Sequence, residues 1–264
     1  METSPRSILY EGTDEHLVSG ACVHTRIEEQ AARTPDRPAI VDAHRSWSYR
    51  QMQHDSELIG EKLQKMGLRT GDVVGSYMPH CAEYVLANLG IFKAGAAIFP
   101  LETNYPPELL SELIEMASIK FILSVDELSG SLPEGFTPGT GRCFNLDDGW
   151  AAQLVAESLP PLDDPKLELT DVAYVTMTSG STGKPKGIVN AHLSAVCDFV
   201  ARIDMLPYSE GDREACNVFF AWESLRPLLA GYPLYIIPDV TILDPKKARL
   251  RFCELRALCK CVAR

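Results

Sequence analysis

The sequence predicts a layered α/β fold in which strands alternate with crossover helices. Two observations point to this class. Helical and strand patterns of apolar residues alternate along most of the chain, and an apolar, β-branched run at residues 172–176 leads directly into a glycine-rich loop. Composition agrees, because 45% of the 264 residues are hydrophobic, which is enough to fill the core of an enzyme domain.

The first elements are a capped helix and a strand–helix–strand succession. Ser48 and Gln51 have the spacing of a capping box, and the apolar positions that follow share one helical face as far as Gly67. A strand is expected at 73–77 and a short strand at 98–101. The segment between them, 81–93, is apolar on most sides, so it predicts a helix buried between layers.

The later elements continue the alternation. Pro106 and Pro107 suit a helix start, and the apolar stripe behind them predicts a helix to residue 117, followed by a strand at 120–124. Closely spaced glycines and prolines predict that the segment 125–170 is rich in loops. A strand at 172–176, a helix at 190–203 and a buried strand at 234–237 complete the pattern.

The loop at 178–187 reads TSGSTGKPKG and has the composition of a phosphate-binding loop. Its hydroxyl groups, glycine backbone and two lysines suit a polyanionic ligand. It is not a Walker loop, because Pro185 follows Gly183 and Lys184 where that pattern requires Ser or Thr. A flexible Gly/Ser linker is the alternative, but the apolar run before the loop and the rigid Pro185 argue against it.

These ten residues resemble the phosphate-loop signature of the adenylate-forming superfamily, which includes acyl-CoA synthetases, luciferases and adenylation domains of nonribosomal peptide synthetases. Three further segments are similar to family elements in the same order: WSYRQM at 47–52, FKAGAAIFPL at 92–101 and AWE at 221–223. The resemblance covers about residues 22–247 and implies an incomplete N-terminal part of the family's large α/β domain. Residues 1–21 are then an N-terminal extension and 248–264 a divergent, basic, cysteine-rich tail.

The resemblance also implies an activity. In this family a carboxylate attacks the α-phosphorus of ATP, which gives an acyl-adenylate and pyrophosphate, so we expect an AMP-forming acid ligase that uses ATP with Mg²⁺. A carrier domain or CoA is the expected acyl acceptor in an intact form. The residues that the resemblance assigns to the nucleotide phosphates are Thr178, Ser179, Gly180, Ser181, Thr182, Gly183, Lys186 and Gly187.

Three residues are candidates for a substrate pocket. Val218 stands where peptide-synthetase domains carry an aspartate that binds an α-ammonium group, so we expect a carboxylic acid other than an ordinary L-α-amino acid: one with a distal amine, or an aryl or aliphatic acid. Trp222 could line the acyl pocket or belong to the core. His192 could touch phosphate or substrate, or cap and pack a helix. Glu223 is expected to be structural, with Arg226 as its partner at i+3.

Several family elements do not follow Trp222 in this sequence: the "YGxTE" segment, the ribose-binding "TGD" and the terminal catalytic lysine. Catalytic residues therefore stay unassigned, and a truncated form is expected. The triplet at 70–72 matches "TGD" by letters only and predicts a turn. For the tail after residue 247, with cysteines at 253, 259 and 261, the alternatives are a basic amphipathic helix, a zinc site without the usual spacing, and a departure from the ancestral reading frame.

Three functional hypotheses therefore stand: an acid ligase, a catalytically inactive nucleotide-binding or regulatory isoform, and a phosphotransferase with an unusual loop. The net charge of −11 argues against a nucleic-acid partner. Eight scattered cysteines predict free thiols and no assigned metal site. The sequence shows no signal peptide and no apolar run of transmembrane length, so a cytoplasmic protein is expected.

Overall fold

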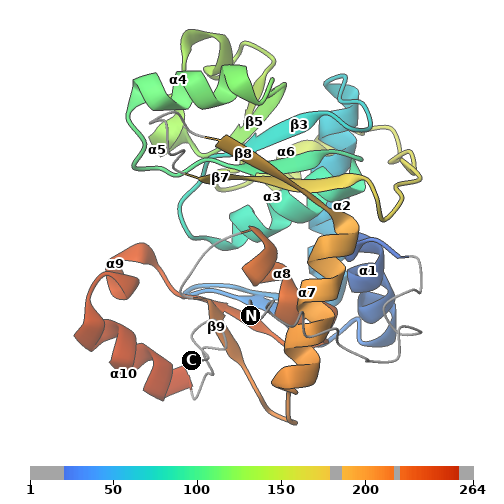
Figure 1. Ribbon diagram of the computed structural model, residues 1–264, viewed down its shortest axis with the longest axis vertical. Coiled ribbons are helices and arrows are strands. Elements are labelled where there is room, and N and C mark those ends of the chain that lie inside the picture. Colours follow the sequence, from blue (N-terminus) through green and yellow to red (C-terminus); the bar gives the residue numbers. More distant parts are fainter. Residues whose placement is uncertain (1–20, 179–185, 217–220, 256–264) are drawn as a thin grey trace, which may run out of the picture.

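The computed structural model describes residues 21–178, 186–216 and 221–255, with the backbone alone at 221–222 and 251–255. In these residues the chain forms two sheets that are flanked and separated by helices (Figure 1). The helices are α1 (Val23–Arg33), α2 (Tyr49–Lys65), α3 (Ala82–Lys93), α4 (Pro107–Met116), α5 (Asp126–Ser129), α6 (Trp150–Ala156), α7 (His192–Met205), α8 (Ala221–Leu229), α9 (Asp239–Ile242), α10 (Pro245–Leu255) and the 3₁₀ turn η1 (Glu134–Phe136).

The larger sheet has the order β6-β5-β3-β4-β7-β8, and the smaller has the order β2-β1-β10-β9. All neighbouring strands are parallel except β7 with β8 and β1 with β2. The strands are β1 (Pro38–Val41), β2 (Ser46–Ser48), β3 (Val73–Ser76), β4 (Ala97–Pro100), β5 (Phe121–Ser124), β6 (Cys143–Asn145), β7 (Val172–Thr178), β8 (Lys186–Ala191), β9 (Glu214–Cys216) and β10 (Leu234–Ile236). These findings confirm the layered α/β class.

Helix α3 lies in the middle of the protein, and each of its twelve residues is buried. It belongs to a hydrophobic core that also contains Ile40 of the smaller sheet and Ile98 of the larger sheet. Helices α2 and α3 approach very closely, because a Cβ on Gly90 would lie 2.6 Å from Cγ2 of Ile59. Helix α2 begins with the predicted capping box: Gln51 N donates to Ser48 Oγ at 3.2 Å, and Ser48 N donates to Gln51 Oε1 at 2.9 Å.

The other face of the larger sheet is covered by α4. Successive residues of a strand point to opposite faces, so Phe99 and Ile122 join a second cluster with Leu110 and Leu113, whereas their neighbours Ile98 and Leu123 face α3. Burial of both faces explains why these strands are short apolar runs without polar alternation.

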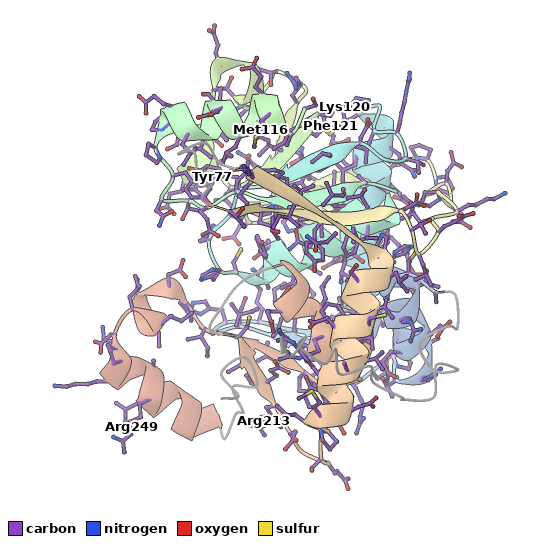
Figure 2. The ribbon with its side chains drawn as sticks, viewed as in Figure 1. Tyr77, Met116, Lys120, Phe121, Arg213 and Arg249 are labelled. Carbon is purple, nitrogen blue, oxygen red and sulfur yellow. The ribbon has the colours of Figure 1, made fainter. Side chains whose placement is uncertain are left out.

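The triplet at 70–72 forms the turn that the sequence predicts. Gly71 has a φ of +84°, and Asp72 N donates to Arg69 O at 3.0 Å. The Asp72 carboxylate accepts from Lys120 Nζ at 2.8 Å, and Lys120 lies at the start of β5 beside Phe121 (Figure 2). The Asp72 side chain thus links a turn to a strand of the same sheet.

The expectation of a loop-rich excursion at 125–170 was incomplete, because this segment contains α5, η1, β6 and α6. Strand β6 has only three residues and pairs with β5 in register Ile122 to Cys143, so tertiary pairing defines it and no periodic pattern reveals it. The cysteines whose side chains are described, at 22, 81, 143, 197 and 216, are free thiols. In that part, no helix has both the length and the apolar character needed to cross a membrane.

Candidate functional site

The predicted phosphate loop joins two strands that pair in an antiparallel hairpin at the edge of the larger sheet. Thr178 ends β7 and lies opposite Lys186, which begins β8, and Thr178 Oγ1 lies 3.4 Å from Lys186 O. Both side chains are exposed at the mouth of the loop. The pairing therefore holds the two ends of the loop next to each other.

The central loop residues Ser179, Gly180, Ser181, Thr182 and Gly183 lie outside the described residues. Gly187 is described and packs closely, because a Cβ there would lie 3.3 Å from Cγ1 of Val175. Of the eight residues predicted to contact phosphate, the structure places Thr178, Lys186 and Gly187 on the two hairpin strands that flank the loop.

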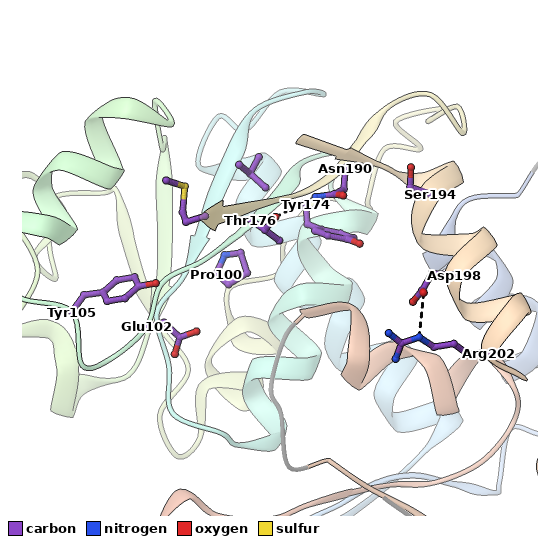
Figure 3. Close-up of a pocket in the computed structure, with 11 residues that line it drawn as sticks. Pro100, Glu102, Tyr105, Tyr174, Thr176, Asn190, Ser194, Asp198 and Arg202 are labelled. Atoms are coloured by element: carbon purple, nitrogen blue, oxygen red, sulfur yellow. Dashed lines mark hydrogen bonds and ion pairs between the residues drawn. The ribbon is translucent and has the colours of Figure 1, made fainter. Parts of the chain in front are cut away.

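A cavity of about 490 Å³ lies beside this hairpin, where β4 and β7 end (Figure 3). Ligands of open α/β sheets bind at the carboxyl ends of parallel strands, which is the position of this cavity. Side chains from the end of β4, the segment after it, β7, β8 and α7 line it: Pro100, Glu102, Tyr105, Tyr174, Val175, Thr176, Met177, Asn190, Ser194, Asp198 and Arg202. The lining combines aromatic rings, amide and hydroxyl groups, and charged side chains of both signs.

A chain of ion pairs leads from the cavity wall to Glu223 and Arg226, which are buried side chains of α8. Arg202 Nε contacts Asp198 Oδ1 at 3.1 Å and Arg202 Nη1 contacts Glu223 Oε1 at 2.6 Å. Arg226 Nη1 contacts Glu223 Oε2 at 3.0 Å, and Arg226 also pairs with Glu214 of β9. The predicted pairing of Glu223 with Arg226 is thus confirmed, whereas the links to α7 and β9 were not predicted, although the i,i+4 spacing of Asp198 and Arg202 was a usable signal.

These charges affect one another strongly because most of them are buried. Burial alone would lower the pKa of Arg226, but the charges of Glu214 and Glu223 raise it overall. Burial, and after it the charges of Asp198 and Glu223, raise the pKa of Tyr174 to about 12. The Tyr174 hydroxyl therefore stays protonated at neutral pH.

His192 does not line the cavity, although the sequence suggested a contact with phosphate or substrate. Its side chain is fully buried at the start of α7, with ring centroids 4.8 Å from Phe92 and 5.8 Å from His24. Burial, and after it the charge of His24, lower its pKa to about 3. Of the two roles that the sequence left open, this placement favours packing, because Phe92 and His24 enclose the ring and burial keeps it neutral.

The other two pocket candidates lie where side chains are not described. Trp222 is the second residue of α8, and Val218 is outside the described residues. Glu223, directly after Trp222, is paired with Arg202 of the cavity wall. This pair places the start of α8 beside the cavity.

Comparison with known proteins agrees with this geometry. The family described as AMP-binding enzyme matches residues 27–256. The glycine betaine reductase ATRR of Emericella nidulans is 33% identical over 220 residues, which are 82% of this chain and 17% of that protein. Tyrocidine synthase 1 of Brevibacillus parabrevis is 33% identical over 233 residues, covering 85% of this chain and 21% of that protein.

Solved structures show the same fold. The nonribosomal peptide synthetase FmoA3 superposes with a TM-score of 0.79 at 25% identity, over 91% of this chain and 25% of that one. The NpsA N-terminal subdomain of Klebsiella oxytoca, in complex with 3-hydroxyanthranilyl-AMSN, superposes with a TM-score of 0.74 at 26% identity, over 92% of this chain and 60% of that one. The chain thus spans about a fifth of the length of the two curated relatives. With its two-sheet architecture and these matches, the chain belongs to the AMP-binding enzyme family, and corresponds to the N-terminal part of the adenylate-forming fold.

Proposed function

We propose that this chain forms the triphosphate-binding side of a site that activates a carboxylic acid as its acyl-adenylate. The observation that carries the proposal is the β7–β8 hairpin, which sets Thr178 opposite Lys186 at the mouth of the loop, next to a cavity large enough for an organic acid. The AMPPNP-bound form of FmoA3 supports ATP as the nucleotide, because that fold accommodates an ATP analogue.

In the proposed reaction, a carboxylate oxygen of the acid attacks the α-phosphorus of ATP. The bond from the α-phosphorus to the bridging oxygen breaks, AMP becomes attached to the carboxylate, and pyrophosphate leaves with the negative charge. The loop residues Thr178 to Thr182, with Lys186, would hold the β- and γ-phosphates through backbone N–H, hydroxyl and ammonium groups. Gly183 and Gly187 would let the backbone approach the phosphates.

Mg²⁺ is expected with ATP. The described residues contain no group of three His, Cys, Asp or Glu side chains that could hold a metal ion. Mg²⁺ commonly binds through substrate phosphates and one or two protein oxygens, so it would enter with the nucleotide and supply countercharge there. The acyl group would then pass to a carrier domain or to CoA, as the peptide-synthetase relatives suggest.

The acid is proposed to be other than an ordinary L-α-amino acid. Val218 lacks the carboxylate that would pair with an α-ammonium group, and burying that group unpaired would cost several kcal/mol. One relative is named for glycine betaine, whose nitrogen carries no N–H at all. Selective exchange with common L-α-amino acids would contradict this part.

Acid-dependent ATP–pyrophosphate exchange tests the activity, and Lys186→Ala is the main variant. We expect its exchange rate to fall at least tenfold, because one charge-assisted contact to phosphate contributes about 1.5–3 kcal/mol. Lys246→Ala, at an exposed lysine of α10, is the charge-matched control and should retain the parent rate.

The same assay separates the alternatives. Saturable ATP binding without exchange for any acid would favour the nucleotide-binding or regulatory hypothesis. Transfer of the γ-phosphate with release of ADP would favour a phosphotransferase. Equal exchange by the Lys186→Ala and Lys246→Ala variants would contradict the assignment of Lys186 to the phosphates.

A further inference from the structure

Helices α9 and α10 form an arm that lies to one side of both sheets (Figure 1). We call residues 239–255 the C-terminal arm. No residue of α9 is buried, and the described side chains of α10 are exposed or half-buried. The Asp239 carboxylate lies against His80 Nδ1 and so attaches the arm to the loop before α3. None of the arm residues lines the candidate cavity, so a role for the arm does not depend on the proposed activity.

The end of the chain is basic, although the protein as a whole is acidic. Residues 245–264 contain seven Lys or Arg and one Glu, which gives a formal charge of +6, whereas the formal charge of residues 1–244 is −17. The Asp244 carboxylate caps α10, because it accepts from Lys246 N at 3.0 Å and from Lys247 N at 3.3 Å. Lys247 Nζ also lies 3.9 Å from Asp244, but an exposed pair of this kind holds the ammonium group only weakly. The cations of α10 are therefore available to an anionic partner.

Exposed apolar side chains accompany these cations. Lys246, Arg249 and Leu250 are exposed and share one face of α10, because they are spaced at i, i+3 and i+4. Figure 2 shows Arg249 on the side of α10 that faces away from the sheets. Val240, Leu243 and Leu250 are 73%, 82% and 64% exposed, so the arm presents three large apolar side chains to solvent beside its charges. Exposed apolar groups that are surrounded by polar ones are typical of a surface that contacts a membrane or a protein.

We propose that the C-terminal arm docks this protein on an anionic phospholipid surface. The cations of α10 contact the lipid phosphates, while Val240, Leu243 and Leu250 enter the interfacial layer. A purely charged partner such as a nucleic acid would leave these apolar side chains in water. Their high exposure places them on a convex surface, which fits a flat and deformable lipid layer better than a shaped protein pocket.

Vesicle binding by the full chain tests the proposal. Phosphatidylcholine vesicles with and without phosphatidylserine are mixed with the protein, and the bound fraction is measured by flotation. The arm variant replaces three cations of α10: Lys246→Gln, Lys247→Gln and Arg249→Gln. The matched control removes the same charge at three exposed arginines outside the arm: Arg33→Gln, Arg50→Gln and Arg69→Gln.

We expect the parent protein and the control to bind only the vesicles that contain phosphatidylserine. Each basic side chain near an anionic surface contributes about fivefold to binding, so the arm variant should bind roughly a hundredfold more weakly. Leu243→Gln leaves the charge unchanged and should weaken binding about tenfold, because it removes one leucine side chain from the interfacial layer. These side chains are exposed, so thermal melts of the variants should match the parent.

Equal binding to both kinds of vesicle, no binding to either, or equal binding by the arm variant and the control would overturn the proposal. Unchanged binding by Leu243→Gln would overturn the part assigned to the apolar side chains. Immobilised polyglutamate and duplex DNA are tested in parallel. Retention on either polymer without vesicle binding would assign the arm to a soluble polyanion and would overturn the assignment to lipid.

Discussion

Replacing Arg226 with leucine should strongly destabilise the protein. The side chain is 3% exposed and pairs with Glu214, which is 1% exposed, and with Glu223, which is 8% exposed. Leucine keeps the apolar volume of the side chain but removes the guanidinium group that pairs with both buried carboxylates. Removing one partner of a buried ion pair costs about 3–5 kcal/mol, so we expect the free energy of unfolding to fall by that amount.

Urea denaturation followed by circular dichroism measures the change, with Arg33→Leu as the control. Arg33 is 71% exposed and lies 4.0 Å from Glu29, so its loss should cost less than about 1 kcal/mol. The pH dependence adds a second readout. Loss of the guanidinium group raises the folded-state pKa of the two buried carboxyl groups, so the folded variant binds more protons than the parent and its deficit in stability should shrink as the pH falls toward 4. A loss as small as that of Arg33→Leu, at all pH values, would refute the reasoning.

Three further predictions concern stability and can be checked by the same denaturation assay. Ser48→Ala removes the capping hydrogen bond of α2 and should cost about 1 kcal/mol; an unchanged midpoint would argue against the cap. Gly90→Ala forces a Cβ to within 2.6 Å of Ile59, so we expect a loss of about 1–3 kcal/mol, whereas Gly130→Ala meets no atom within 4 Å and should be neutral; equal effects would contradict the close approach. His192, with its pKa lowered to about 3 in the folded state against about 6.5 when unfolded, favours protonation of the unfolded chain, so its contribution to stability is lost as the pH falls. Between pH 7 and pH 5 it should account for about 2 kcal/mol, and His192→Phe should flatten the profile by that amount; an identical slope in both proteins would show that the ring is not held neutral.

The longer elements could be predicted because each has a local signal. The capping box at Ser48, the paired prolines before α4 and the apolar segment of α3 lie within single turns or single helices, so the sequence alone carries them. The strands β1, β2 and β9 were not predicted. Each is defined by its pairing in the smaller sheet, β1 and β9 with β10 and β2 with β1, and these pairings are not visible in the local sequence. Strand β8 was not predicted either. The sequence analysis interpreted the segment as a loop, and the antiparallel pairing of β8 with β7 is visible only in the folded hairpin.

In the candidate site, too, the sequence predicts contacts between neighbours along the chain but not contacts between distant residues. The sequence placed the phosphate loop at the end of a strand and paired Glu223 with Arg226, because both follow from neighbours along the chain. It gave His192 an undecided role, since nothing local shows that Phe92 and His24 enclose it.

By itself, the sequence determined the α/β class, the order of the main helices and strands, the phosphate loop and the resemblance to the adenylate-forming enzymes. These properties depend on periodicity, capping and turn chemistry, which act over a few residues. Only the tertiary structure decided that β1 pairs with β10, that Arg202 joins Asp198 to Glu223, and that Glu102 faces the same cavity as Tyr174. Those contacts join residues far apart in the chain, and their geometry is set by how whole helices and sheets pack in the folded protein.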